Sequence, residues 1–317
     1  MASQRLLVTG GTGFLGRWTI QHWRQRHPEV EVWCASDRPC PDDLPAGCCR
    51  RLDLRDPTAV GELLTACRPT GVIHLAGLIG GGLGDLLSVN VAGTECLYRA
   101  LVQTQPEAPI VQAGSAAIYG MVRPDELPVT ERQPLRPLNA YALSKAAQDL
   151  LAEAMWRTHG LKVIRARIFN MLGPGQPDAL VPMTFVRQLR ACSGRAGQRL
   201  EVGNVSARRD FVDVRDVAAA FDALLEKGVA GEAYNVASGQ DVSIRDVIDE
   251  LLRISGRPVA VEPSADRMRA SDVPCVRADV SKMHLQTGWE RRLTLDQSLR
   301  DMWRQVEGPT AHGPGLP

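Results

Sequence analysis

Short runs of apolar and β-branched residues alternate with longer amphipathic stretches through the first half of the chain. The short runs predict strands, at Arg5–Thr9, Val30–Ala35, Val72–Ala76, Ile110–Gly114 and Leu161–Arg167. The longer stretches have helical periodicity, at Arg17–Arg26, Thr58–Cys67, Leu86–Thr104 and in a segment that carries Tyr141 and ends near His159. Regular β–α alternation of this kind predicts a parallel sheet with helices on both faces.

After Phe169 the pattern changes to a mixture of helices and strands. Two helices are predicted here, at Val181–Cys192 and at Ser243–Ser255, where Ser243 is a suitable N-cap. Two strands are also expected, at Leu200–Val202 and Tyr234–Ala237.

These elements predict an α/β protein with two parts. The first is a Rossmann-type, doubly wound parallel sheet over residues 1–168, to which the chain returns at about 205–240. The second is a smaller mixed α/β lobe for the substrate, from residues 169–204 and 241–307. Residues 308–317 are rich in Gly and Pro and predict a disordered tail.

A glycine-rich turn joins the first predicted strand to the first predicted helix. Gly10 allows a tight turn, Gly13 lets a pyrophosphate approach the backbone, and Gly16 lets the helix pack on the strand. The phosphates would lie at a helix N-terminus, where free amides and the helix dipole favour negative charge. The order of elements predicts a dinucleotide site. The spacing is G-x-x-G-x-x-G, and the alternative is a turn without function.

Composition and charge exclude several classes of protein. Lys and Arg number 37 against 36 Asp and Glu in 317 residues, so no basic field favours nucleic acid. No apolar run approaches membrane-spanning length, and the N-terminus carries no signal-peptide pattern. The eight cysteines form no CxxC pair, and the adjacent Cys48 and Cys49 are poorly placed to bridge each other. We therefore expect free thiols in a reducing cytoplasm, with neither a metal site nor a disulfide framework.

The most informative pair of side chains is Tyr141 and Lys145, which are one helical turn apart and share a face. An ammonium beside a phenol favours phenolate, so we expect the pKa of Tyr141 to fall toward neutrality. Such a tyrosine exchanges protons at physiological pH. Tyr and Lys at this spacing also occur by chance on ordinary helices.

Ser115 lies at the carboxyl end of a predicted central strand, which is the edge where open α/β sheets bind ligands. Its hydroxyl is placed to hydrogen-bond a substrate oxygen together with the Tyr141 phenol. A serine that only forms a turn is the alternative.

These motifs together resemble the extended short-chain dehydrogenase/reductase family, which contains nucleotide-sugar epimerases, dehydratases and reductases. The similarity runs from Leu6 to about Val306. It implies an NAD(P)H cofactor, and a Lys145 that also holds the nicotinamide ribose. It further implies that the cofactor contacts Gly10, Gly13, Phe14, Leu15 and Gly16 at the turn, Asp53 and Leu54 over the adenine, Leu75, Ala76, Gly77 and Asn90 along the cleft, and Tyr141 with Lys145.

Five blocks in the second half occur in one order and are most similar to GDP-4-keto-6-deoxy-D-mannose reductases. They are Arg167–Gln176, Val202–Asn204, Arg209–Asp216, Tyr234–Gly239 and Arg269–Pro274. This resemblance implies substrate contacts at Ser115, Ala116, Asn170, Val181, Arg209 and Arg269, with the two arginines on the diphosphate. A planar guanidinium suits bidentate phosphate contacts, although most arginines are solvated surface charges.

The sequence also departs from its relatives. Sugar 4,6-dehydratases of this superfamily place an acid pair, or at least a glutamate, where Ala116 and Ala117 stand. Elimination of water needs an acid and a base beyond the tyrosine, so a dehydratase is disfavoured. The segment Leu78–Asp85, near the expected substrate, is shorter and richer in glycine than in other family members, so the sequence does not determine the identity of the sugar. In addition, Ala270 follows Arg269 where the family has proline.

The end of the second strand bears on the choice of cofactor. Ser36 holds the usual acidic position, followed by Asp37 and Arg38. An acid here binds the ribose 2′-hydroxyl of NAD, and an arginine accepts the 2′-phosphate of NADP. Asp37 would repel that phosphate and Arg38 would attract it, and NAD(H) is slightly favoured.

The function expected from these features is reduction of the C4 keto group of a GDP-4-keto-6-deoxyhexose by NAD(P)H. A nucleotide-sugar 4-epimerase with tightly held NAD uses the same side chains and is the alternative. A non-catalytic dinucleotide-binding protein is disfavoured because Ser115, Tyr141 and Lys145 are all present. By analogy, the helices Leu86–Thr104 and Tyr141–His159 would form a homodimer interface.

Overall fold

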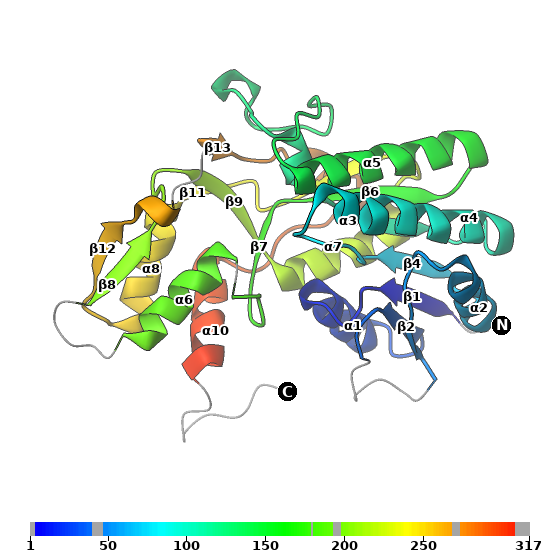
Figure 1. The fold of residues 1–317 in the computed structure, drawn as a ribbon, viewed down its shortest axis with the longest axis horizontal. Helices are drawn as coiled ribbons and strands as arrows, with labels where there is room; N and C mark the ends of the chain where they lie inside the picture. Colours follow the sequence, from blue (N-terminus) through cyan, green and yellow to red (C-terminus); the bar gives the residue numbers. More distant parts are fainter. Residues whose placement is uncertain (1–3, 40–46, 179, 193–197, 268–272, 308–317) are drawn as a thin grey trace.

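A seven-stranded parallel sheet forms the centre of the larger part of the molecule (Figure 1). The computed structural model describes residues 4–39, 47–178, 180–192, 198–267 and 273–307. The strand order is β10-β6-β5-β4-β1-β2-β3, and all neighbours are parallel. The strands are β1 (Arg5–Thr9), β2 (Glu31–Ser36), β3 (Cys49–Arg51), β4 (Gly71–His74), β5 (Ile110–Ser115), β6 (Val163–Ile168) and β10 (Ala233–Val236). The strand order reverses between β1 and β4, so ligands are expected outside the carboxyl ends of these strands.

Helices cover both faces of this sheet, as the β–α alternation predicted. Leu6 and Val8 of β1 pack on one face against α1 and α7, and Leu7 packs on the other face against α4. Strands buried on both faces need apolar residues at nearly every position, which explains the continuous apolar runs in the sequence. The helices are α1 (Phe14–Arg26), α2 (Pro57–Cys67), α3 (Leu83–Leu87), α4 (Thr94–Thr104), α5 (Ala140–His159) and α7 (Val214–Lys227).

The smaller lobe lies beside the carboxyl ends of the central strands (Figure 1). Its core combines helices α6 and α10 with α8, and includes Phe185, Ile248 and Trp303. One small sheet pairs β9 with β7, β11 and β13, and β8 pairs with β12. The elements are β7 (Asn170–Leu172), α6 (Val181–Ala191), β8 (Arg199–Val202), β9 (Arg208–Asp213), β11 (Asp241–Ser243), α8 (Ile244–Ser255), β12 (Ala260–Pro263), β13 (Cys275–Val276) and α10 (Leu295–Glu307). Helix α9 (Ser281–Thr287) packs instead against α7 and β10 of the larger part. Three 3₁₀ turns complete the list, η2 (Ala116–Tyr119), η3 (Pro124–Glu126) and η4 (Ala265–Arg267).

The prediction of one continuous helix over Leu86–Thr104 is wrong in where the helix starts and in its continuity. The helical segment begins earlier, as α3, and passes through a π-helical turn, η1 (Ser88–Gly93), before α4. Within this turn, the Asn90 side chain accepts a hydrogen bond from Leu78 N at 2.7 Å and donates to Leu78 O at 3.0 Å. π-turns inside helices occur often at functional sites, and this one faces α5.

The cysteines follow the expectation only in part. Six described cysteines are free thiols, but Cys49 is disulfide-bonded, so the prediction of free thiols throughout is wrong. Bridging depends on how close two Cα atoms come in the fold, and spacing along the chain does not reveal that distance. Among the described residues, no helix is long and apolar enough to cross a membrane, and no group of three or more His, Cys, Asp or Glu is arranged to hold a metal ion. The predicted tail 308–317 lies outside the described residues.

Candidate active site

The glycine turn closes tightly against the neighbouring strand ends. Gly10 has φ +70°, and a Cβ there would lie 2.7 Å from Ala76 N. Gly16 leaves no room for a side chain either, because its Cβ would overlap the Gly10 carbonyl oxygen. Gly13 is the N-cap of α1, so Phe14 and Leu15 form the first turn of that helix. Free amides at this helix N-terminus are suited to a pyrophosphate, and the glycines leave the approach to them open.

Ser115 and Tyr141 meet at the carboxyl end of β5. The Ser115 hydroxyl accepts a hydrogen bond from Ala117 N at 3.2 Å and caps η2. The same hydroxyl hydrogen-bonds the Tyr141 phenol, which favours phenolate. Tyr141 is positioned by the start of α5, where Asn139 accepts a hydrogen bond from Ala142 N at 2.8 Å. The predicted partnership of the two hydroxyls is therefore present in the fold.

The expected direction of the tyrosine shift is wrong. Burial raises the pKa of Tyr141 above its ordinary value, and the Ser115 hydrogen bond lowers it only in part. Desolvation disfavours the charged form of any acid, and the one-turn spacing in sequence contains no information on burial. The Lys145 ammonium is turned instead toward the Ala113 carbonyl oxygen, 2.6 Å from Nζ.

Lys145 is itself buried, with 7% of its surface exposed. Burial lowers the pKa of Lys145 to about 8, and the charge of Asp149 opposes this shift. His74 lies in the same interior, where burial and then the Lys145 charge lower its pKa to about 3. His74 is therefore neutral, and Lys145 is the cation of this region near neutral pH.

Asn90 supports the segment after β4 through hydrogen bonds of its side chain. Its side chain is fully buried, with its amide bonded to the Leu78 backbone and, at 2.9 Å, to the Ser144 hydroxyl. It thus braces the segment after Leu75, Ala76 and Gly77 and ties it to α5. A Cβ on Gly77 would lie 2.9 Å from Asn90 Oδ1, which explains the glycine.

The far end of the cofactor cleft combines residues of β2 and β3. Ser36 is paired in register with Arg51, and its hydroxyl hydrogen-bonds Thr12 Oγ1 at 2.6 Å. Arg51 Nε donates to the Asp37 carbonyl oxygen at 3.0 Å, while Arg38 and Asp37 are exposed. Sequence reasoning missed Arg51, because only the strand pairing places it beside Ser36.

Asp53 and Leu54 lie just beyond this end of the cleft. Asp53 accepts hydrogen bonds from Arg55 Nε at 2.9 Å, and this contact lowers the pKa of the Asp53 carboxyl. Leu54 is buried and packs beneath Gly93.

Three of the predicted substrate residues, Asn170, Val181 and Arg209, lie on elements of the smaller lobe. Asn170 pairs in register with Phe211, and Arg209 lies two positions earlier on β9, so Asn170 and Arg209 share one face of the small sheet. Arg209 Nη1 donates to the Val273 carbonyl oxygen at 2.6 Å. Val181 opens α6. Arg269 lies outside the described residues.

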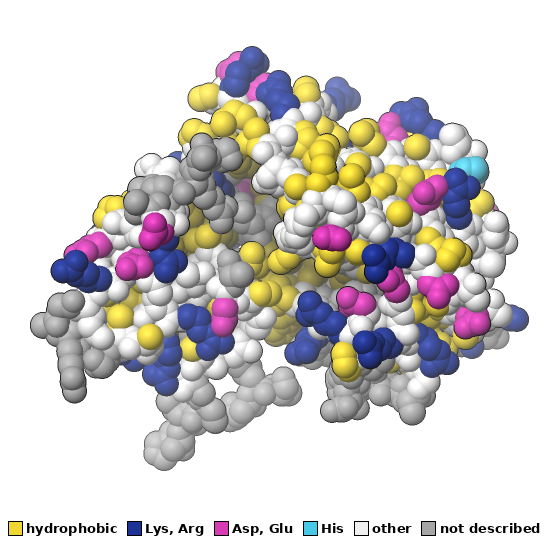
Figure 2. Space-filling view, in the orientation of Figure 1, with side chains coloured by type: hydrophobic (Ala, Val, Ile, Leu, Met, Phe, Trp, Pro, Cys, Tyr) yellow, Lys and Arg dark blue, Asp and Glu magenta, His cyan; other side chains and the backbone are white. Residues whose placement is uncertain are grey.

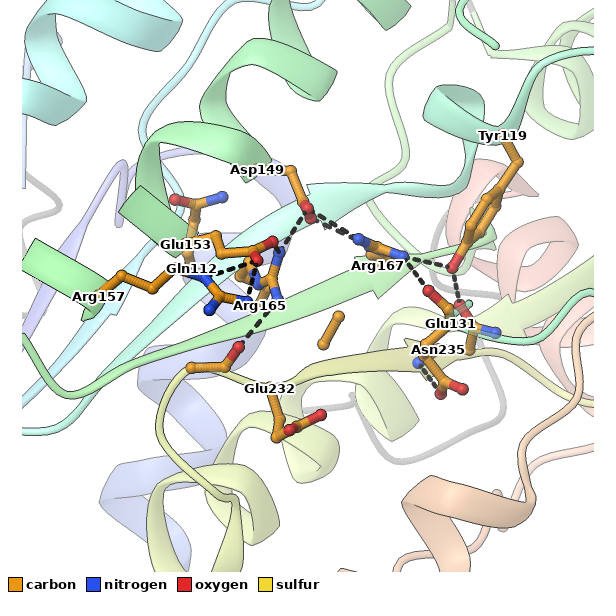
Figure 3. A network of polar contacts seen from close by, with 12 residues as sticks. Gln112, Tyr119, Glu131, Asp149, Glu153, Arg157, Arg165, Arg167, Glu232 and Asn235 are labelled. Carbon is orange, nitrogen blue, oxygen red and sulfur yellow. Dashed lines mark hydrogen bonds and ion pairs between the residues drawn. The ribbon is translucent and has the colours of Figure 1, made fainter. Parts of the chain in front are cut away.

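A buried ionic network on α5 and β6 was also missed by sequence reasoning (Figure 3). Asp149, 1% exposed at its side chain, accepts hydrogen bonds from Arg167 and from Arg165 Nη1 at 3.0 Å. Arg167 Nη1 reaches on to the Tyr119 hydroxyl at 3.1 Å. The network fixes α5, and with it Tyr141 and Lys145, against the central sheet. The signal in the sequence was two arginines alternating with apolar residues in a strand that reads as buried.

Fold and site together define an α/β dinucleotide-binding enzyme in which a serine, a tyrosine and a lysine meet at the end of β5. The chain belongs to the NAD dependent epimerase/dehydratase family, whose profile matches residues 6–237.

Three comparisons are the most informative. The chain is 36% identical over 304 residues to GDP-6-deoxy-D-mannose reductase from Pseudomonas aeruginosa, covering 94% of this chain and 95% of that protein. It is 28% identical to GDP-6-deoxy-D-talose 4-dehydrogenase from Aggregatibacter actinomycetemcomitans, covering 95% and 97%. The solved structure of RMD from P. aeruginosa complexed with NADPH superposes with a TM-score of 0.84 at 35% identity, covering 95% of this chain and 97% of that one.

Proposed function

We propose that this protein reduces the C4 keto group of GDP-4-keto-6-deoxy-D-mannose, or a closely related GDP-4-keto-6-deoxyhexose, to the GDP-6-deoxyhexose. The observation that carries the proposal is the hydrogen-bonded Ser115–Tyr141 pair, with Lys145 one turn along the same helix. The similarity to GDP-6-deoxy-D-mannose reductase over nearly the whole length supports the choice of substrate.

The chemistry needs one hydride and one proton. A nicotinamide cofactor supplies the hydride when it is bound, and the glycine turn with the N-terminus of α1 holds its pyrophosphate. Tyr141 gives its phenolic proton to the C4 oxygen, while Ser115 hydrogen-bonds the same oxygen and orients the keto group. The raised pKa of Tyr141 suits this role, because the phenol remains protonated at neutral pH.

Lys145 has two tasks in this scheme. Its ammonium holds a ribose hydroxyl of the cofactor, and its charge stabilises the tyrosinate left after proton transfer. Burial strengthens both interactions because water does not screen them.

The substrate side is assigned by resemblance and by position. Asn170 and Arg209 share one face of the small sheet and would hold the nucleotide-sugar, with Arg209 and Arg269 at the diphosphate. By the same resemblance, Val181 and Ala116 would complete the substrate contacts. Ala116 and Ala117 carry no carboxyl group, so these two positions supply no acid–base pair for elimination.

The 2′-end of the adenosine site favours NADPH over the NAD(H) that the sequence slightly suggested. Ser36 replaces the acid that would bind a free 2′-hydroxyl, and Arg51, which pairs with Ser36 and bonds the Asp37 carbonyl oxygen, adds a second cation at this strand end in addition to Arg38. Two arginines against Asp37 leave a net positive charge for a 2′-phosphate. The similarity to a structure complexed with NADPH is consistent with this assignment.

The enzyme is proposed to act as a homodimer in the cytoplasm. Figure 2 shows hydrophobic side chains gathered on the surface over α3 and α5. Leu143 and Leu150 are exposed seven residues apart on α5, and Ile79 and Leu83 lie exposed before and within α3. An apolar face of this kind on a helix is suited to pairing with a second copy.

The decisive experiment supplies GDP-4-keto-6-deoxy-D-mannose with NADPH or NADH and follows nicotinamide absorbance. We expect stoichiometric oxidation of the reductant and appearance of a GDP-6-deoxyhexose. A 4-epimerase would instead convert a nucleotide-sugar without added reductant. If neither NADPH nor NADH is oxidised under conditions in which a known reductase is active, the proposal is wrong.

A further inference from the structure

Gln148 contacts the ammonium of Lys145 inside the protein. Lys145 Nζ donates to Gln148 Oε1 and to the Ala113 carbonyl oxygen. Gln148 is only 1% exposed and lies on the same helix, three residues beyond the lysine. Two of the three ammonium donors are therefore directed at protein acceptors, and the third is the one that the proposed function assigns to a ribose hydroxyl.

The orientation of the Gln148 amide is determined by Thr94. The Thr94 hydroxyl has a single proton, which it donates to the Asn90 carbonyl oxygen at 2.7 Å. It can therefore only accept from Gln148 Nε2, at 2.7 Å. A flipped amide would place its NH₂ group against the Lys145 ammonium and its oxygen against the Thr94 lone pairs. The amide oxygen consequently faces Lys145.

The same reasoning fixes the next residue of the network. Thr94 Oγ1 also lies 2.8 Å from His74 Nε2, so His74 donates from Nε2 and accepts at Nδ1 from Thr9 Oγ1, at 2.7 Å. Thr9 directly precedes Gly10 of the phosphate-binding turn. Hydrogen bonds of fixed direction thus connect both the glycine turn and the Lys145 ammonium to the Thr94 hydroxyl, which accepts from His74 on one side and from Gln148 on the other.

We propose that Gln148 is a positioning residue, whose amide oxygen holds the Lys145 ammonium in the place where it would meet a ribose hydroxyl of the cofactor. This role rests on the proposed function of Lys145. A glutamine that merely fills a buried space would contribute to stability alone, and the two roles differ in what a substitution does to the lysine.

The charges around Lys145 define the test. Asp149 on α5 raises the pKa of Lys145, and its carboxylate is shared with Arg165 and Arg167 of β6. His74 on β4 is neutral, and Tyr141 lies one turn before Lys145 on α5. Removing the Gln148 acceptor weakens the charged form of Lys145, whereas a carboxylate at this position strengthens it.

The experiment measures the dissociation constants of NADPH and NADH, by tryptophan fluorescence, as a function of pH for wild type, Gln148→Met and Gln148→Glu. Gln148→Met should weaken binding about tenfold at pH 7 and move the alkaline loss of affinity to lower pH. Gln148→Glu should restore binding and move that loss to higher pH. Gln112→Met is the matched control, because Gln112 is equally buried but bonds Tyr98, and it should leave the pH profile unchanged.

Lys145→Met separates this inference from the proposed function. If Lys145→Met keeps the alkaline loss of affinity, Lys145 does not hold the cofactor and the proposed function of Lys145 is wrong. If Lys145→Met abolishes it but Gln148→Met and Gln148→Glu both keep the wild-type profile, the role of Gln148 is overturned. Should Gln148→Met fail to fold by circular dichroism, the shift in Gln148→Glu decides alone.

Discussion

Arg167 holds the Asp149 carboxylate with two hydrogen bonds, from Nε at 3.0 Å and from Nη2 at 2.8 Å. Both residues are buried, and Asp149 lies one turn beyond Lys145 on α5. The pair joins the helix that carries the catalytic candidates to strand β6, next to the strand that ends in Ser115. The geometry of the site therefore depends on a contact that touches neither cofactor nor substrate.

Removing one partner of this pair should be costly. Asp149→Ala leaves the buried Arg167 guanidinium without a carboxylate and leaves Arg165 only the partly exposed Glu153, and we expect the free energy of unfolding to fall by about 3–5 kcal/mol. Urea denaturation at pH 7.5 measures this change. Arg99→Ala is the control, since Arg99 forms an exposed pair with Glu95 outside this network, and it should cost at most about 0.5 kcal/mol. Equal effects of the two substitutions would contradict a structural role for the buried pair.

Tyr141→Phe should separate cofactor binding from catalysis. The variant keeps the aromatic ring but lacks the proton that Tyr141 is proposed to give to the C4 oxygen. We expect kcat to fall by about 10²–10⁴-fold, with the dissociation constant of NADPH within about twofold of wild type. Single-turnover kinetics and fluorescence titration give the two values. Unchanged turnover would show that another group delivers the proton.

Acid should destabilise the protein through His74. Its folded pKa of about 3 is below the unfolded value of 6.5, so the unfolded state binds the extra proton first. The stability contributed by the neutral imidazole is present above pH 6.5 and is lost as pH falls toward 3. At pH 5 the loss from this residue is about 2 kcal/mol. Denaturation at pH 7.5 and pH 5 should show a smaller difference in His74→Gln than in wild type, and equal differences would exclude His74 as the source.

Arg51 should set the preference between NADPH and NADH. Arg51→Ala removes one cation from the 2′-phosphate position, and we expect kcat/KM for NADPH to fall about tenfold while the value for NADH stays nearly constant. Calorimetry with 2′,5′-ADP and 5′-AMP gives the same comparison without turnover. Arg50→Ala is the matched control, because Arg50 is the preceding residue on β3 but lies over the Trp33 ring. A loss of NADH activity as large as the loss with NADPH would argue against a phosphate contact.

Leu150→Glu should dissociate the proposed dimer. Leu150 is 57% exposed on α5, and a buried carboxylate at a subunit interface would be strongly unfavourable. Light scattering after gel filtration should show wild type at twice the chain mass and the variant at the chain mass. Leu285→Glu, at an 80% exposed position on α9, should remain dimeric. A wild-type monomer would refute the assembly itself.

Much of the fold follows from local patterns. The apolar runs of β1 and β4, the helical periodicity of α5 and the glycines at 10, 13 and 16 each act within a few residues, through burial, backbone turns and helix spacing. The four-residue spacing, which is also a local feature, placed Tyr141 and Lys145 on one face of α5. These features were sufficient to predict the parallel sheet, the dinucleotide turn and the catalytic candidates.

The rest was decided by which segments the tertiary structure brings together. Strand pairing placed Arg51 beside Ser36, and packing of α5 on β6 gave Asp149 its arginines. Burial raised the pKa of Tyr141 where adjacency to Lys145 alone would have lowered it. The partner and the solvation of a polar group depend on residues far away in the chain, and no local pattern contains them. The sequence by itself therefore determined which groups are proposed to react, whereas the fold determined their orientation and their protonation.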